Sequence, residues 1–196
     1  MKQVKEKLTV KRVIEKVNFN IARLEEEYYR CSFENCDFSG MKVNDTIFED
    51  CDFKCCNFSL TKFFNTLRGC LFIECKMTGT DFSDISRFVS SFRFKGCQLS
   101  YASFIRVKMK GLTFTECSLN EASFDNADME SSVFDKCDLD RASFFDTNLE
   151  RADFSTSYGF RINPNHNRLK KAVFSETGLS GLLSHLDIEI IPDPGL

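Results

Sequence analysis

Apolar side chains return every five residues along most of this chain. In the stretch CDLDRASFFDTNLERADF, residues 137–154, the residues Leu139, Phe144, Leu149 and Phe154 are spaced by five, and a small residue stands two places before each. An α-helix repeats every 3.6 residues and a flat strand every 2, so neither element explains this spacing. The pattern therefore predicts a regular structure other than a long helix or an open sheet.

The five-residue register covers residues 31–174, with one residue missing near 64–69 and two extra residues near 83–93. We call the apolar residue of each five-residue unit its centre, and the two interruptions of the register its slips. Taking every fourth centre gives four series that stay aligned across both slips. One series is entirely phenylalanine: Phe33, Phe53, Phe72, Phe94, Phe114, Phe134, Phe154 and Phe174. A four-sided coil of about 20 residues would point each centre inward and pair its backbone with neighbouring coils at about 4.8 Å. Because a single coil cannot bury its own apolar side chains, the sequence predicts an all-β solenoid stabilised by contacts between neighbouring coils.

Most of the ten cysteines fit this coil without disulfides or metal. Six cysteines stand two residues before the centres of another series, which is Phe38, Phe58, Met77, Leu99, Leu119 and Leu139. These six form one column: Cys36, Cys56, Cys75, Cys97, Cys117 and Cys137. A second column holds Cys31, Cys51 and Cys70, so that only Cys55 falls outside the scheme. Cysteine is small and apolar, which suits a crowded inward corner.

The segments beyond the two ends of the register are expected to be caps, because the terminal coils of a solenoid expose unpaired backbone groups. Residues 1–30 are expected to form the N-terminal cap, as a strand or as a short helix. Residues 175–196 are expected to form a short helix followed by an apolar strand, since Ser175 and Glu176 suit a helix start. This C-terminal segment is predicted to join two copies of the chain through Leu179, Leu182, Leu183, Leu186, Ile188 and Ile190. A monomeric cap is the alternative.

Two features on the lateral surface of the predicted solenoid are candidates for contacts with a partner. The second slip, SDISRFVSSF, suggests a bulge with Arg87 and Phe88 as contact residues, although a tolerated surface insertion explains it equally well. Phe64, Ile105 and Phe145 each follow a centre by one residue, so they should point outward on one side. They are candidates for a contact surface, although scattered exposed apolar residues are normal.

Charge is unevenly distributed along the chain, although the net charge of the 196 residues is only −3. Residues 85–115 contain six basic residues and no acidic ones, whereas residues 116–160 contain eleven acidic and three basic residues. Nine of these acidic residues fall at outward positions: Asp125, Asp128, Glu130, Asp135, Asp138, Asp140, Asp146, Glu150 and Asp153. Such an acidic zone would be attracted to a protein groove that binds phosphates. The alternative is that these residues serve turn geometry and solubility.

The sequence offers no constellation of residues for catalysis. It has no phosphate-binding glycine loop, no nucleophile elbow and no zinc-protease motif, and His166 and His185 have no evident partners. Enzyme activity, a cofactor and a metal site are therefore not expected. No signal peptide or membrane-spanning run is apparent, so we expect a cytoplasmic protein that does not bind membranes. We also do not expect it to bind nucleic acid directly.

The local motifs resemble those of the pentapeptide-repeat family. The best matches are CDFSG at 36–40, CDLDR at 137–141 and ADFST at 152–156. This resemblance implies a right-handed quadrilateral β-helix over about residues 31–174. The segment ENCDFSG (34–40) and the C-terminal region 163–190 are similar to the Qnr group of quinolone-resistance proteins and to the related albicidin and microcin immunity proteins.

Resemblance to the Qnr group implies a function as well as a fold. It implies a rod-shaped dimer that resembles duplex DNA in size and negative charge, acts on DNA gyrase and topoisomerase IV, and protects them from drugs or toxins. The chain departs from the group in two ways. The projecting loops that some Qnr proteins carry are reduced here to a two-residue excess near 83–93, and the segment 85–115 is basic. A scaffold or regulatory binding module whose partner is not a topoisomerase is the alternative.

Overall fold

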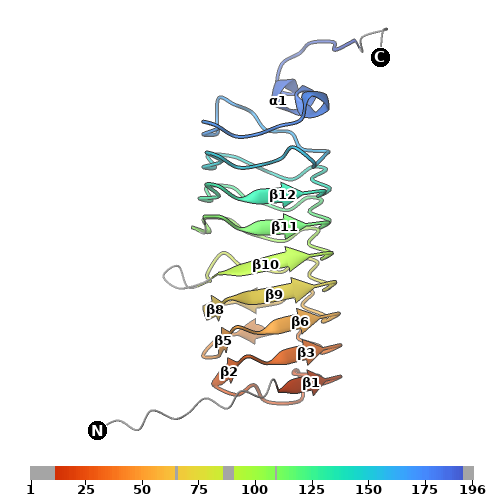
Figure 1. Cartoon of the computed structure of the whole chain (residues 1–196), viewed down its shortest axis with the longest axis vertical. Coiled ribbons are helices and arrows are strands. Elements are labelled where there is room, and N and C mark those ends of the chain that lie inside the picture. The colour runs from red at the N-terminus through yellow and green to blue at the C-terminus, as the bar shows by residue number, and fades with distance from the viewer. Residues whose placement is uncertain (1–11, 65, 86–90, 109, 192–196) are drawn as a thin grey trace, which may run out of the picture.

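The computed structural model describes residues 12–64, 66–85, 91–108 and 110–191, which form a tall stack of four-sided coils (Figure 1). The chain climbs from β1 at one end of the rod to α1 at the other, and neighbouring coils pair in parallel. The all-β solenoid predicted from the five-residue spacing is confirmed.

Each coil contributes one short segment to each of four faces, which we number in chain order. The first face is a seven-stranded parallel sheet of β1 (Val13–Glu15), β3 (Ser32–Glu34), β6 (Asp52–Lys54), β9 (Cys70–Ile73), β10 (Phe92–Lys95), β11 (Thr113–Thr115) and β12 (Val133–Asp135). The second face is joined by single parallel bridges, such as Asn57 with Lys76. The third face includes β4 (Lys42–Val43) and β7 (Lys62–Phe63), and the fourth includes β2 (Glu27–Tyr29), β5 (Ile47–Glu49) and β8 (Thr66–Arg68).

The core of the rod is a set of phenylalanine ladders. On the first face, Phe114 stacks between Phe94 and Phe134, with ring centroids 5.1 Å from each. It also meets Phe104 and Phe124 edge to face, at 5.5 and 6.0 Å. Both register slips leave the first face in register, since Phe53 pairs with Phe72 and Phe72 with Phe94. The missing and extra residues are therefore absorbed elsewhere in the coil.

The small residues at the corners also have a hydrogen-bonding role. Most of the cysteine and threonine side chains at the corners donate to a backbone carbonyl of the preceding coil, as in Thr61 Oγ1 to the Phe38 carbonyl (2.7 Å) and Cys56 Sγ to the Phe33 carbonyl (3.4 Å). Burial raises the pKa of the Cys51 thiol to about 12, so it stays protonated and can donate. No group of three potential metal ligands occurs among the described residues. The buried cysteines of the two columns occupy corner positions, where most of them link neighbouring coils by hydrogen bonds.

The stack begins earlier than the boundary at residue 31 that the repeat pattern predicts. Strand β1 pairs with β3, Phe19 stacks on Phe38 at 4.6 Å, and Tyr28 stacks on Phe48 at 5.3 Å. Residues 12–30 thus form a further coil, and the rest of the expected N-terminal cap lies outside the described residues. The sequence pattern does not reveal this coil because large or charged residues occupy most of its corner positions.

The C-terminal end of the core is closed by Phe160, which lies 5.5 Å from Phe174 and 5.6 Å from Phe154. A 3₁₀ turn, η1 (Glu176–Gly178), and the one-turn helix α1 (Ser180–Leu183) cover it. A methyl group on Gly181 would collide with the Phe160 carbonyl oxygen, so only glycine allows α1 to approach this closely. Neither helical segment is long enough to cross a membrane, and no such span occurs in the described part of the chain.

The apolar strand expected after the helix is not formed in residues 184–191. Figure 1 shows this tail leaving the end of the stack rather than pairing with a coil. A strand needs a neighbour for its backbone groups, and the last coil is already covered by η1 and α1. The helix is confirmed, and the strand prediction is wrong for the isolated chain.

Candidate protein-binding surfaces

The nine acidic residues proposed from the sequence form a band around the C-terminal half of the rod. None of them is buried, but they do not share one face. The first face carries Asp135 and Asp153, the second Asp138 and Asp140, the third Asp125 and Asp146, and the fourth Asp128, Glu130 and Glu150. We call this set the acidic band.

Basic neighbours neutralise part of the acidic band on the fourth face. Glu130 contacts Lys110 and Arg151, each with an N···O distance of 2.5 Å. The hydrogen bond from Lys110 is the main reason that the pKa of the Glu130 carboxyl lies below its usual value. Asp128 accepts a hydrogen bond from Asn148 Nδ2 at 2.6 Å and lies 3.8 Å from Lys110. Because these two carboxylates are paired within the rod, they contribute less to the negative electrostatic potential around it than unpaired carboxylates would.

Other members of the band are engaged in local structure. Asp125 accepts hydrogen bonds from Ser143 Oγ (2.6 Å) and from the Phe145 amide (3.0 Å), which tie neighbouring coils together. Asp135 accepts from Thr156 at 2.9 Å. These bonds are consistent with the structural alternative raised by the sequence, in which acidic residues support turns and coil pairing.

Asp146 and Glu150 differ from the rest of the band. Neither carboxylate has a hydrogen-bond or ion-pair partner among the described residues, and Asp146 is exposed at a corner. Their charge is therefore the least compensated in the band. They are the members best placed to attract a positively charged partner.

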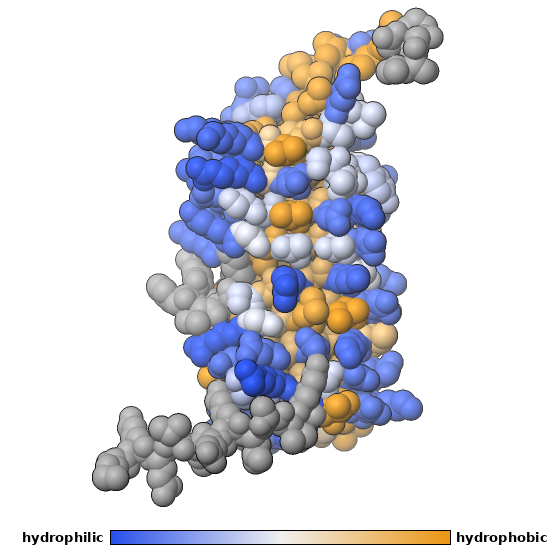
Figure 2. All heavy atoms as spheres, viewed as in Figure 1, coloured by the Kyte–Doolittle hydropathy of each residue, from blue (hydrophilic) through white to orange (hydrophobic). Residues whose placement is uncertain are grey.

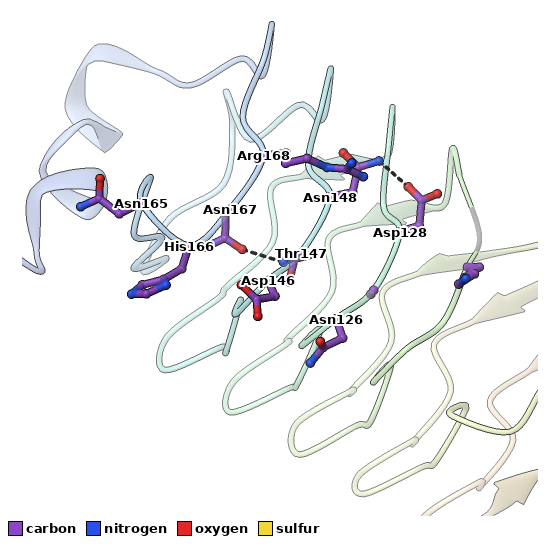
Figure 3. Close-up of a pocket in the computed structure, with 11 residues that line it drawn as sticks. Asn126, Asp128, Asp146, Thr147, Asn148, Asn165, His166, Asn167 and Arg168 are labelled. Atoms are coloured by element: carbon purple, nitrogen blue, oxygen red, sulfur yellow. Dashed lines mark hydrogen bonds between the residues drawn. The ribbon is translucent and has the colours of Figure 1, made fainter.

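Asp146 lies at the edge of a polar groove of about 570 Å³ between the third and fourth faces (Figure 3). Asn167 Oδ1 accepts from the Thr147 amide at 3.0 Å, and His166 and Arg168 border the same groove. In Figure 3 the side chains of Arg168, Asn148 and Asp128 lie close together on one wall. Sequence reasoning missed this groove because its walls come from coils about 20 residues apart, although the cluster of Asn165 and Asn167 marks its C-terminal side.

The basic segment forms a belt next to the acidic band. Arg93 and Lys95 lie on β10 in the first face, whereas Lys108 and Lys110 lie on the fourth face. Of these four residues, only Lys110 forms an ion pair with another described residue. The surface charge of the rod therefore changes from positive to negative between neighbouring coils.

The C-terminal end exposes a group of apolar side chains at the tip of the rod (Figure 2). Leu179, Leu183, Leu186, Ile188 and Ile190 are exposed by between 39% and 54%. Leu182, by contrast, packs against the core. The predicted dimerisation residues therefore divide into an outer group and one inner residue that seals the last coil. The predicted loop contacts Arg87 and Phe88 lie outside the described residues.

Comparison with known proteins identifies the fold. A sequence profile of the pentapeptide repeat region matches residues 27–104 and 65–144, which together cover more than half of the chain. Two trypsin-treated variants of QnrB1, a plasmid-mediated fluoroquinolone resistance protein, superpose with TM-scores of 0.59 and 0.57 at 20% and 22% identity. These superpositions cover 92% of this chain and 98% and 99% of the two QnrB1 chains.

A structure of HetL, which is involved in heterocyst differentiation regulation in the cyanobacterium Nostoc, is also similar. Its TM-score is 0.51 at 13% identity, covering 85% of this chain and 88% of HetL. No curated protein sequence matches the chain. The repeat profile, the four-sided coil and the phenylalanine ladders agree, and this chain belongs to the pentapeptide-repeat family.

Proposed function

We propose that this chain is a non-enzymatic, cytoplasmic homodimer that binds DNA gyrase or topoisomerase IV. It competes with DNA for part of the DNA-binding surface of that enzyme. The acidic band next to an exposed apolar tip is the observation that carries this proposal. The similarity in fold to QnrB1, a fluoroquinolone resistance protein, supports it.

Dimerisation at the tip would bring two acidic bands together in the middle of a longer rod. A surface that binds the phosphates of duplex DNA would attract such a zone electrostatically. The attraction would weaken as salt screens it. Asp146 and Glu150 would contribute most, because neither carboxylate is compensated by another described residue.

Removing these two charges is expected to weaken binding to purified gyrase. We expect Asp146→Asn with Glu150→Gln to raise the Kd by about tenfold at low salt, and by less at high salt. The measurement is a binding titration with labelled protein at several salt concentrations. A matched control, Glu26→Gln with Asp45→Asn, removes two exposed charges at the other end of the rod and should leave the Kd unchanged. Equal losses in both double variants would contradict a role for the acidic band.

A scaffold with a different protein partner is the second candidate function. It is favoured by the internal neutralisation of Glu130 and Asp128, which reduces the negative field of the band. In that case gyrase and topoisomerase IV would not bind at low salt, and neither double variant would change a topoisomerase assay.

A further inference from the structure

The cap formed by η1 and α1 closes only part of the C-terminal end of the rod. On the third face, the Ile162 amide donates to the Gly181 carbonyl of α1 at 3.1 Å, so that α1 stands where a further coil would lie. On the fourth face, no described segment takes the place of a further coil beside Leu169. The fourth face therefore ends at the last coil, whose outer edge is open.

The open edge leaves backbone groups of the last coil without partners. One coil earlier, the Leu149 amide donates to the Arg168 carbonyl at 2.9 Å. The equivalent amide of Leu169 has no acceptor among the described residues, and the same is true of the Lys171 amide. Unpaired strand edges of this kind can pair with a strand from another chain.

Residues 186–190, which we call the acidic tail, have the pattern of a strand but no neighbour to pair with. Leu186, Ile188 and Ile190 alternate with Asp187 and Glu189, and all five side chains are exposed. This period of two is typical of a strand with one apolar and one polar side. Figure 1 shows the segment leaving the end of the stack and projecting past α1.

The acidic tail matches the open edge in spacing and in charge. Leu169 packs against the core, and the exposed Arg168 and Lys170 stand on either side of it. In the acidic tail, a carboxylate likewise stands on either side of Ile188. None of these four charged side chains forms an ion pair with another described residue. If Ile188 lay beside Leu169, each carboxylate would lie next to a basic side chain in either strand direction.

Neighbouring coils of the rod already use such pairs. On the fourth face Lys110 pairs with Glu130, and on the first face Lys54 pairs with Glu34 at 3.1 Å. In both pairs the two residues occupy equivalent positions of adjacent coils. A strand added beside the last coil would therefore extend an arrangement that the rod repeats.

In an end-to-end dimer, a segment that projects past its own tip lies beside the last coil of the partner. We propose that the acidic tail of each copy pairs with the open edge of the other copy's last coil. Two-fold symmetry makes the exchange reciprocal. Backbone hydrogen bonds and ion pairs of the added strand would then join the apolar contacts at the tip. This inference rests on the proposed function, because it requires the proposed homodimer.

Amide hydrogen exchange in the full chain tests the added strand. We expect the Leu169 and Lys171 amides to exchange at least tenfold more slowly above the dimer Kd than below it, because the second copy would accept their hydrogen bonds. The Leu149 amide is bonded within the chain and should be equally protected at both concentrations. Protection of Leu169 that persists below the dimer Kd would show that the acidic tail pairs with its own chain, and would overturn the exchange.

A charge swap tests the ion pairs independently. We expect Asp187→Lys with Glu189→Lys to raise the dimer Kd at least tenfold, since the symmetric dimer would hold each repulsive contact twice. Adding Arg168→Glu and Lys170→Glu to that variant should restore the Kd to within about threefold of the parent.

The matched control, Lys16→Glu with Arg23→Glu, reverses two exposed charges at the other end of the rod and should leave the dimer Kd unchanged. If the parent sediments as a dimer but the Leu169 amide stays unprotected and the charge swap has no effect, the exchange is excluded and the proposed dimer survives. If the parent sediments as a monomer, the dimer and the exchange are both overturned, whereas gyrase binding is decided by its own titration.

Discussion

Replacing Phe114 with alanine is expected to lower the free energy of unfolding by about 4 kcal/mol. Phe114 is fully buried and stacks on a phenylalanine ring above and below it, with two more rings at its edges. Truncation removes the buried ring and leaves a cavity that the stiff neighbouring coils cannot close. Because each coil depends mainly on its neighbours, hydrogen exchange should increase most in the coils containing β10, β11 and β12.

Equilibrium unfolding in urea measures this loss. Thr113→Ala is the matched control, since Thr113 precedes Phe114 in β11 but points outward and is half-buried. We expect the control to change the free energy of unfolding by less than about 0.5 kcal/mol. A loss of less than about 1 kcal/mol for Phe114→Ala would show that the ladder can repack, contrary to the stacking account.

Two added charges at the C-terminal tip are expected to abolish the proposed dimer. Leu183→Asp with Leu186→Asp would place two carboxylates in the apolar interface, where desolvation costs several kcal/mol. We expect the dimer Kd to rise by more than about a hundredfold. Leu182 is left intact because it packs against the core. Replacing it would disrupt the folded C-terminal cap, and loss of the dimer could then not be assigned to the interface.

Sedimentation velocity separates the outcomes for the dimer. The parent chain should sediment at twice the monomer mass of 22.6 kDa, and the double variant at that monomer mass. Asn20→Asp with Asn44→Asp adds the same charge at exposed positions near the other end and should remain dimeric. A dimer that survives both leucine substitutions would exclude the C-terminal tip as the interface.

The repeat makes the interior of this rod predictable from sequence. Phe33, Phe53 and Phe72 continue one series through the first register slip, so the inward series and the cysteine columns follow from the spacing of residues alone. The first coil is harder to recognise, although Ile14, Phe19 and Tyr28 follow nearly the same register. Arg12 and Glu26 stand at corners that are small elsewhere, and they hide the repeat at this end.

The outer surface is less predictable than the core. The sequence places Glu130 and Asp146 equally on the outside, but only the structure distinguishes them. Glu130 meets Lys110 and Arg151, which are about 20 residues away in sequence and adjacent across coils. Side chains of neighbouring coils select their partners by rotamer and distance, and these are not encoded in the five-residue period.

A DNA supercoiling assay with purified gyrase, titrated with this protein in the presence and absence of a quinolone, tests the central claim most directly. We predict that the protein restores supercoiling in the presence of the drug, and that Asp146→Asn with Glu150→Gln restores it less well. Inhibition without rescue would retain topoisomerase binding but exclude protection. No effect on supercoiling at low salt, with or without the drug, would contradict the claim that this rod acts on a topoisomerase.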